Sequence, residues 1–443
     1  MNSGSARNTL FMVFGVACAA VLAAENDASR IKPWPKNPQY WQYQGEPVVL
    51  LGGTKDDNLF QLPDLEKHLD ELARVGGNYI RNTMSDRNDH GFEVYPYKRL
   101  PNGKYDLDQW NDEYWKRFER MLQLTRDRHI IVQIEVWDRF DYSDQRGGSN
   151  WKNHPYNPRN NINYTAEEIG LKTTYPKHPG ANEQPFFYTV PRLKNNQKLL
   201  RYQVARVDKM LSYALRHGNV LYCMDNETSG SPEWGRYWSQ HIRKRAAEAG
   251  VDVHTTEMWD QWNPLGEGHK HTFDHPEQFS FVDVSQNNHN KGQQHWDNLL
   301  AVRHYVSRPL RPVNTVKIYG ADTGRYGNSR DGEERFWRNI FGGCAGTRFH
   351  RPDSGLGLSE RSKPHIRSMR LLLDEFDIYH SQPDGPSRLL GHRKDNEAYL
   401  TFIDGEQYAL YFPDGGEVSL NLSKAKGDFD LKWIEITAAR WKK

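Results

Sequence analysis

Cysteine is scarce in this sequence, with 3 cysteines among 443 residues. Cys18 stands in an apolar run, but Gly15 occupies the place where a lipobox would have leucine, so a lipid anchor is not predicted. Cys223 and Cys344 fall in predicted core strands on opposite sides of the expected fold, and a disulfide needs closely matched Cβ positions. The sequence therefore gives no sign of a disulfide framework and predicts two buried free thiols.

A bias toward one sign of charge is also lacking. The chain has 59 Lys and Arg against 57 Asp and Glu, for a formal net charge of +2. The two signs are interleaved, and no basic stripe stands out. A nucleic acid is therefore not expected as a partner.

Long hydrophobic runs are missing as well. The run from Leu10 to Leu22 is shorter than the roughly 20 apolar residues that span a bilayer. Arg7 precedes this run and Ala23 and Ala24 follow it, which is the pattern of a secretory signal. We predict that residues 1–24 are a signal peptide, that the rest of the chain is secreted or periplasmic, and that it has no membrane span.

Aromatic residues, by contrast, are plentiful, with 14 Trp and 23 Tyr. Aromatic rings with polar edges suit stacking on sugars or a protein interface. The alternative is that they fill a large core.

Residues 48–380 alternate between short apolar runs and amphipathic helical stretches. Strands are expected at 48–53, 78–84, 129–137, 220–224, 251–257, 279–285, 312–319 and 344–350. Helices are expected at 63–75, 110–128, 199–217, 234–249, 296–307, 333–341 and 364–379. This α/β alternation predicts a parallel sheet closed into a (β/α)8 TIM barrel. An open doubly wound sheet is the alternative, but no Gly-rich dinucleotide turn follows the first strand.

Two segments depart from this alternation. Residues 138–194 have no clear periodicity, and a loop of this length in a compact domain is most often functional, so we expect it over the active face. After Pro383 come short strand-like segments at 399–403, 408–412, 418–422 and 429–433. The sequence thus predicts a barrel domain over 31–383 and a small antiparallel β-sandwich domain over 386–443.

Side chains that carry chemistry concentrate where the predicted strands end. In a TIM barrel the active site is built at those ends. Carboxylates transfer protons there, amides and Arg bind hydroxyls, and Trp stacks on a sugar ring. The candidate substrate-binding residues are Asn226, Arg81, Glu135, Trp137, Trp259, Asp283, His289, Lys317, Tyr319, Arg348 and His350. Each alone fits a solvated loop contact, but together they predict a carbohydrate site.

The fourth expected strand ends in the strongest candidate for catalysis. Val220 to Met224 is followed by Asn226 and Glu227. A carboxylic acid at the mouth of a parallel sheet, beside an amide, is what a general acid needs. The alternative is a turn that leads into the helix opened by Ser231 and Pro232. We take Glu227 as the candidate catalytic acid/base.

These motifs resemble the large clan of (β/α)8 glycoside hydrolases that carry Asn-Glu after strand four. Asp225-Asn226-Glu227 is similar to the acid/base signature, and the resemblance implies that Asn226 binds a sugar 2-hydroxyl. Tyr79-Ile-Arg81 matches the strand whose Arg lies near the nucleophile. The chain looks most like the apiosidase-like (DUF4038-type) members, in which a C-terminal β domain labelled collagen-binding follows the barrel. The segment Gln407 to Leu422, with Phe429 to Ile434, is similar to that domain.

The chain departs from the clan at the second carboxylate. The resemblance implies a Glu at the end of strand seven, where this sequence has Lys317, and no Glu occurs between Pro309 and Arg330. The candidates for the missing role are Asp322 on the following loop, and Glu257, Asp283 or Glu135 from other strands. A Lys at this place would lower the pKa of neighbouring carboxyl groups and hold an acidic group, or it would form an ion pair within the mouth.

The sequence therefore predicts a secreted glycoside hydrolase that needs no cofactor or metal and acts on a poly- or oligosaccharide. Arg81, Lys317, Arg348 and His350 on one rim suggest an acidic or sulfated glycan. A carbohydrate-binding barrel that does not cleave its ligand is the second hypothesis, because the strand-seven Glu is missing. A metal-dependent hydrolase is a third, which the lack of a His-x-His after strand one disfavours.

Overall fold

The computed structural model of the protein describes residues 29–85, 90–145, 150–322, 326–385 and 388–442. The predicted signal peptide lies outside these residues. Within the described ranges, no helix is long and apolar enough to cross a membrane.

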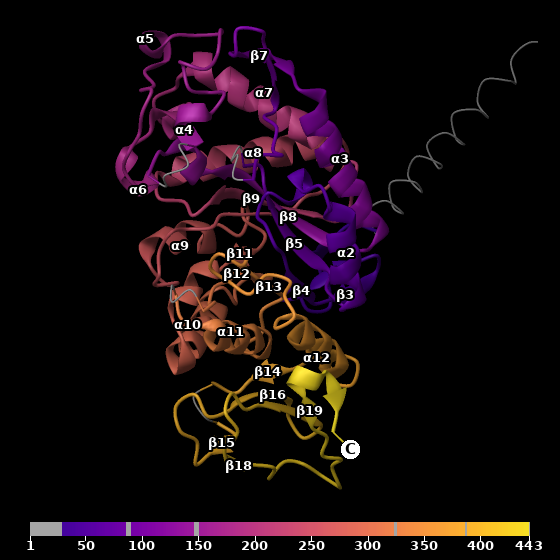
Figure 1. Ribbon diagram of the computed structural model, residues 1–443. Coiled ribbons are helices and arrows are strands. Elements are labelled where there is room, and N and C mark those ends of the chain that lie inside the picture. The colour runs from indigo at the N-terminus through magenta and orange to yellow at the C-terminus, as the bar shows by residue number, and fades with distance from the viewer. Residues whose placement is uncertain (1–28, 86–89, 146–149, 323–325, 386–387, 443) are drawn as a thin grey trace, which may run out of the picture.

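An eight-stranded parallel sheet forms the centre of the molecule, in the order β10-β9-β8-β5-β4-β13-β12-β11 (Figure 1). Its strands are β4 (Leu50–Gly53), β5 (Tyr79–Thr83), β8 (Ile131–Asp138), β9 (Val220–Asn226), β10 (Thr255–Thr256), β11 (Val282–Asp283), β12 (Val313–Ile318) and β13 (Gly346–Phe349). Every residue of these strands is buried, as expected for a sheet covered on its outer face. The predicted (β/α)8 TIM barrel is confirmed.

The helices between the strands pack around the sheet. They are α2 (Leu65–Arg74), α3 (Asp112–Asp127), α7 (Gln197–Ala214), α8 (Pro232–Glu248), α9 (Glu267–Phe273), α10 (Gly292–Tyr305), α11 (Ser329–Phe341) and α12 (Lys363–Leu373). The sequence predicted all of these except α9. This helix is short, and five of its seven residues are polar or charged, so no apolar periodicity reveals it.

The fifth and sixth barrel strands are much shorter than the sequence predicted. β10 and β11 have two residues each, against predictions over 251–257 and 279–285. They lie at the two ends of the hydrogen-bonded order, so each pairs with only one ladder partner, β9 and β12 respectively. An apolar run indicates that a segment is buried, but it does not indicate how many of its residues pair with a neighbouring strand.

Short elements also lie outside the barrel sheet. β1 (Lys32–Pro33), β2 (Trp41–Tyr43) and β3 (Glu46–Val48) form an N-terminal sheet. The indole of Trp41 donates a hydrogen bond of 3.0 Å to Asn314, near the start of β12. This sheet therefore packs on the strand starts, away from the strand ends that carry the candidate site. A hairpin of β6 (Tyr97–Arg99) and β7 (Tyr105–Trp110) lies between the strand expected at 78–84 and the helix expected at 110–128, where no strand was predicted.

The long segment after β8 folds into short helices, namely η2 (Arg139–Tyr142), α4 (Asn150–Asn153), α5 (Ala166–Ile169), α6 (Pro179–Asn182) and η3 (Pro185–Tyr188). Aromatic contacts hold it together, with Tyr142 stacked on Phe186 at a centroid distance of 4.1 Å. Phe186 also packs on Trp137 of β8, so the segment shares the core of the barrel. Such contacts join residues far apart in the sequence, which periodicity does not reveal.

The C-terminal part consists of small antiparallel sheets beside α11 and α12, drawn in yellow in Figure 1. Its strands are β14 (Gln382–Pro383), β15 (Leu390–Gly391), β16 (Tyr399–Ile403), β17 (Gln407–Tyr411), β18 (Ser419–Leu420), β19 (Ile434–Glu435) and β20 (Arg440–Trp441). Trp337 of α11 stacks on Tyr411 and joins this part to the barrel. The prediction of a strand over 429–433 is wrong, because Leu431 is 79% exposed and the strand begins only at Ile434.

The barrel depends on a close approach between its first two strands, which yields a testable prediction. A Cβ added to Gly52 of β4 would lie 1.9 Å from the backbone oxygen of Tyr79 in β5. We expect Gly52→Ala to lower the free energy of unfolding by about 3 kcal/mol or more, because backbone atoms would have to move. Urea unfolding would measure this. Gly391→Ala in β15, where the nearest atom is 3.6 Å away, is the matched control. Equal midpoints for the two variants would contradict the prediction.

Candidate active site

A cavity of about 540 Å³ opens at the carboxyl ends of the barrel strands. The residues that line it come from strand ends and from the loops that follow them: Asp57, Arg81, Phe140, Gln145, His178, Asn226, Glu227, Asp260, Trp262, His289, Lys317, Tyr319, Tyr326, His350, Arg351, Asp353 and Ser354. Polar and aromatic side chains dominate this set, which is the composition expected of a site for a hydroxyl-rich ligand.

Glu227 is placed by a turn of the backbone at the end of β9. Its φ is 56°, in the left-handed region that side chains other than glycine seldom adopt. Directly after it, Ser231 caps helix α8 and Pro232 occupies the first turn. Local strain of this kind often marks a functional position. The carboxylate lies in the cavity with 12% of its side chain exposed.

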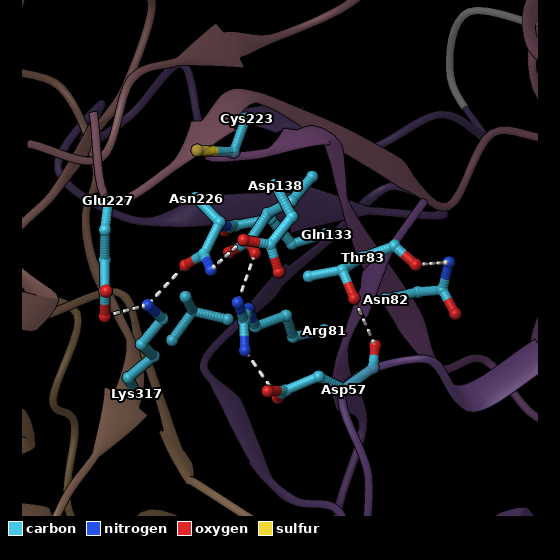
Figure 2. A network of polar contacts seen from close by, with 12 residues as sticks. Asp57, Arg81, Asn82, Thr83, Gln133, Asp138, Cys223, Asn226, Glu227 and Lys317 are labelled. Atoms are coloured by element: carbon cyan, nitrogen blue, oxygen red, sulfur yellow. Dashed lines mark hydrogen bonds and ion pairs between the residues drawn. The ribbon is translucent and has the colours of Figure 1, made fainter. Parts of the chain in front are cut away.

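Lys317 meets this carboxylate from the other side of the barrel mouth. It belongs to β12, which is five positions away from β9 in the sheet order. Its ammonium group lies 2.7 Å from Glu227 Oε1 and also donates a hydrogen bond to the side-chain oxygen of Asn226 (Figure 2). The Tyr319 hydroxyl donates to the same Glu227 oxygen at 2.8 Å. The charge of Glu227 is therefore compensated within the protein.

Asn226 connects this group to the next strand. Its amide nitrogen donates a hydrogen bond of 3.1 Å to Asp138 at the end of β8. Asp138 also accepts from the backbone N–H of Phe140 at 3.1 Å and so caps η2. The orientation of Asn226 is thus set by Lys317 on one side and Asp138 on the other.

A second charged cluster surrounds Asp57, on the loop after β4. Arg81 of β5 forms an ion pair with it (Figure 2). Arg351 lies 3.3 Å from the same carboxylate. Burial alone would raise the pKa of Asp57, but Arg81, His350, Arg351 and Arg348 together hold it well below the usual value. Asp57 is therefore ionised at any pH at which the protein works, and it is not suited to donate a proton.

The structure brings seven of the predicted residues together around the cavity. Arg81, Asn226, Glu227, His289, Lys317, Tyr319 and His350 all line it. They come from β5, β9 and β12, and from the segments after β11, β12 and β13. Their agreement with the prediction follows from the barrel, which brings the ends of all its strands to one face.

None of the four carboxylates proposed for the second role lines the cavity, and Asp322 and Glu257 are the clearest cases. Asp322 has a side chain that is 73% exposed, accepts a hydrogen bond from the backbone of Ser329 and lies 3.7 Å from Arg361. Glu257 is buried, accepts a hydrogen bond from the Thr228 hydroxyl and faces α8, where a Cβ on Gly235 would collide with it. Glu257 therefore belongs to the buried frame of the barrel, whereas Asp322 lies on the exposed surface.

Five more predicted residues lie beneath or beside the cavity. Glu135 forms a buried ion pair of 2.5 Å with Arg81, and Arg348 donates a hydrogen bond of 3.0 Å to Thr54. Asp283 accepts from the backbone of Ser285. The two predicted tryptophans, Trp137 and Trp259, are buried against Trp238 and His271. Strand-end position alone does not distinguish such buried groups from those that face a ligand.

Sequence reasoning missed a wall of residues that stand further along the loops. Trp262 is 65% exposed and stacks on His289 at a centroid distance of 4.7 Å. Tyr326 stacks on Tyr319 at 4.6 Å. Asp260, Arg351 and Asp353 also line the cavity but were not chosen as candidates. Most of them would have been included if the search for candidates had continued a few residues past the end of each predicted strand.

The described residues contain no cluster of three or more His, Cys, Asp or Glu placed to hold a metal ion. Both cysteines of the described chain, Cys223 and Cys344, are buried free thiols, as predicted. The site as described is thus built from carboxylates, cations, amides and aromatic rings.

No family model matches the chain, and no curated protein matches it. Its fold is nevertheless shared with solved structures. A glycoside hydrolase family 5 structure from Bacteroides vulgatus has a TM-score of 0.57 at 13% identity, over 90% of this chain and 84% of that one. A structure described as a glycoside hydrolase has a TM-score of 0.57 at 11% identity, over 94% and 90%.

A family 5 mannosidase structure from Rhizomucor miehei is also similar, with a TM-score of 0.51 at 12% identity over 72% of this chain and 85% of that one. At this level of identity the likeness shows a common fold. The narrower resemblance to the apiosidase-like group stays a prediction that depends on the motifs alone.

The environment of Glu257 predicts a pH dependence of stability. Burial raises its pKa from 4.5 to about 7, although the Thr228 hydrogen bond and Arg139 oppose the shift. Between these pH values the unfolded chain loses a proton that the folded chain keeps, so stability falls as pH rises. We expect Glu257→Gln to remove this fall, which is on the order of a few kcal/mol. Urea unfolding below, within and above the window measures it, and parallel profiles for the two proteins would refute it.

Proposed function

We propose that this protein hydrolyses glycosidic bonds of a poly- or oligosaccharide and that Glu227 is its essential carboxylate. The observation that supports the proposal is the position of Glu227, which projects from the end of β9 into a polar cavity at the mouth of a TIM barrel. We also propose that the chain is exported, on the strength of the signal-like first 24 residues.

The chemistry of the cavity fits a sugar substrate. Glycoside hydrolysis needs a carboxylate near the scissile bond and groups that bind hydroxyls. Asn226 and the carboxylates of Asp57 and Asp353 offer hydrogen-bond acceptors and donors to hydroxyls. Trp262 offers an indole face at the rim, and an exposed indole of this size contributes little to the core. The solved structures of similar fold add that this architecture accommodates glycoside hydrolysis.

A second candidate function is carbohydrate binding without cleavage. The observation in its favour is Lys317, which occupies the place where the resemblance implies a second catalytic carboxylate and forms an ion pair with Glu227. An ammonium group at that place does not stabilise a positively charged sugar carbon. The experiment below separates the two functions.

We expect Glu227→Gln to reduce the turnover of glycans by about 100- to 10,000-fold, because the amide cannot exchange protons, while sugar binding is retained. Release of reducing ends from a panel of polysaccharides, with mannans included, measures turnover, and calorimetry measures binding. Glu183→Gln is the matched control, since Glu183 is also a left-handed glutamate but is exposed and does not line the cavity. If the wild-type protein binds a glycan but cleaves none in the panel, the binding function replaces the proposal.

The aromatic rim leads to a separate prediction. Trp262→Ala should weaken glycan binding roughly fivefold, because loss of one stacking contact costs about 1 kcal/mol. Trp262→Phe should recover part of the affinity. The measurement is a titration in the Glu227→Gln background, with Trp433→Ala as the control, because Trp433 is similarly exposed but lies in the C-terminal part. Equal affinities for the Trp262→Ala and Trp433→Ala proteins would exclude a stacking role.

A further inference from the structure

The side chain of Lys317 makes its polar contacts with residues at the end of another strand, not with those of its own. It is 1% exposed, and its side chain crosses the barrel mouth to reach two residues at the end of β9, Asn226 and Glu227. Burial of an ammonium group is costly unless a partner compensates its charge. The partner here is Glu227, at 2.7 Å. Each of the two groups therefore stabilises the charged form of the other.

Tyr319, two residues after Lys317, acts on the same carboxylate. Its hydroxyl donates a hydrogen bond of 2.8 Å to Glu227 Oε1. Burial, and then the charge of Glu227, raise the pKa of Tyr319 well above 10, so this phenol remains a donor. Hydrogen bonds donated to a carboxylate favour its ionised form. Two donors, one from β12 and one from the residue directly after it, thus converge on a single oxygen of Glu227.

The other charged groups near this pair come from every side of the mouth. Asp138 of β8 is connected to the pair through Asn226, and Arg81 of β5 lies close enough to influence Tyr319. The rings of His350 and His289 contact the Tyr319 ring edge-on at 5.0 and 5.9 Å. Asp260, on the segment after β10, also lines the cavity, whereas the Glu257 carboxylate faces α8. Lys317 is in direct contact with Glu227, as an ion pair of 2.7 Å.

We infer that Lys317 is a positioning residue that holds Glu227 as an ionised carboxylate, so that Glu227 accepts a proton in the reaction instead of donating one to the leaving oxygen. This inference rests on the proposed function and refines it. A proton passes from water to Glu227, the water oxygen bonds to the anomeric carbon, and the glycosidic C–O bond breaks. The leaving oxygen takes a proton from solvent water, and the proton later released by Glu227 neutralises the hydroxide. The net reaction is hydrolysis.

The test reads the ionisation of Glu227 in the full-length protein without substrate. The carboxyl groups of glutamate are labelled with carbon-13, and the Glu227 resonance is assigned by its loss in Glu227→Gln. We expect the wild-type resonance to be that of a carboxylate throughout the working pH range. Lys317→Met should raise the midpoint of its titration by roughly one to three pH units, whereas Lys317→Arg should leave it nearly unchanged.

Matched variants separate this role from a merely structural one. Lys363→Met removes another buried lysine, which pairs with Glu71 and Glu360 on the outside of the barrel, and should not move the Glu227 midpoint. Tyr319→Phe removes the second donor and should raise the midpoint by less than Lys317→Met, so it gives a reading even if the Lys317→Met protein does not fold. A protonated Glu227 in the wild-type protein at neutral pH, or an unchanged midpoint in folded Lys317→Met, overturns the inference.

Turnover gives an independent reading. If the wild-type protein cleaves a glycan, its rate should fall at low pH as Glu227 becomes protonated. In Lys317→Met this fall should move to higher pH together with the midpoint of the Glu227 titration, and in Lys317→Arg it should lie at the wild-type pH. A fall that does not move overturns the inference while the proposed function stands. If no glycan is cleaved, the proposed function fails, and the carbon-13 titration alone still decides whether Lys317 holds Glu227 ionised.

Discussion

The mouth of this barrel depends on one buried ion pair that joins its two sides. Lys317 of β12 and Glu227 after β9 come from strands that are distant in the sheet order, and only the closed form of the sheet brings them within 2.7 Å. The pair fixes the carboxylate, occupies Asn226 and defines what the cavity can do chemically. The remainder of the site is arranged around it.

The charged cluster around Asp57 differs from the Lys317–Glu227 pair in its balance of charges. Asp57 has Arg81, Arg348 and Arg351 around it, so its negative charge is fixed by an excess of cations. Glu227, in contrast, pairs with Lys317 and lies partly open to the cavity. Of these two carboxylates, Glu227 is therefore the one whose protonation a substrate or a single substitution can change. That asymmetry singles it out on physical grounds, apart from any resemblance.

The sequence was sufficient to predict the barrel because its central strands are short apolar runs that alternate with helices bounded by caps and glycines. Prediction failed where that signal is weak, as in the two-residue strands β10 and β11, and where an apolar segment such as 429–433 stays exposed. For the site, residues that end a strand were found, since the barrel brings them to one face. Trp262 and Tyr326 lie on loops, and the course of a loop leaves no periodic pattern in the sequence from which it could be predicted. Glu257 shows the reverse error, because a strand-end position does not tell which side of the sheet a side chain faces.

Stability alone does not account for the charges in the mouth. Buried ion pairs gain little over well-packed apolar residues of the same volume, because the loss of hydration offsets most of their attraction. The Lys317–Glu227 pair nevertheless occupies the barrel mouth, and the Arg81–Glu135 pair lies buried next to the cavity. Glu227 also adopts a strained backbone conformation to reach its partner. Such costs are understandable if the charges are needed for a ligand, and the cavity above them is where that ligand would bind.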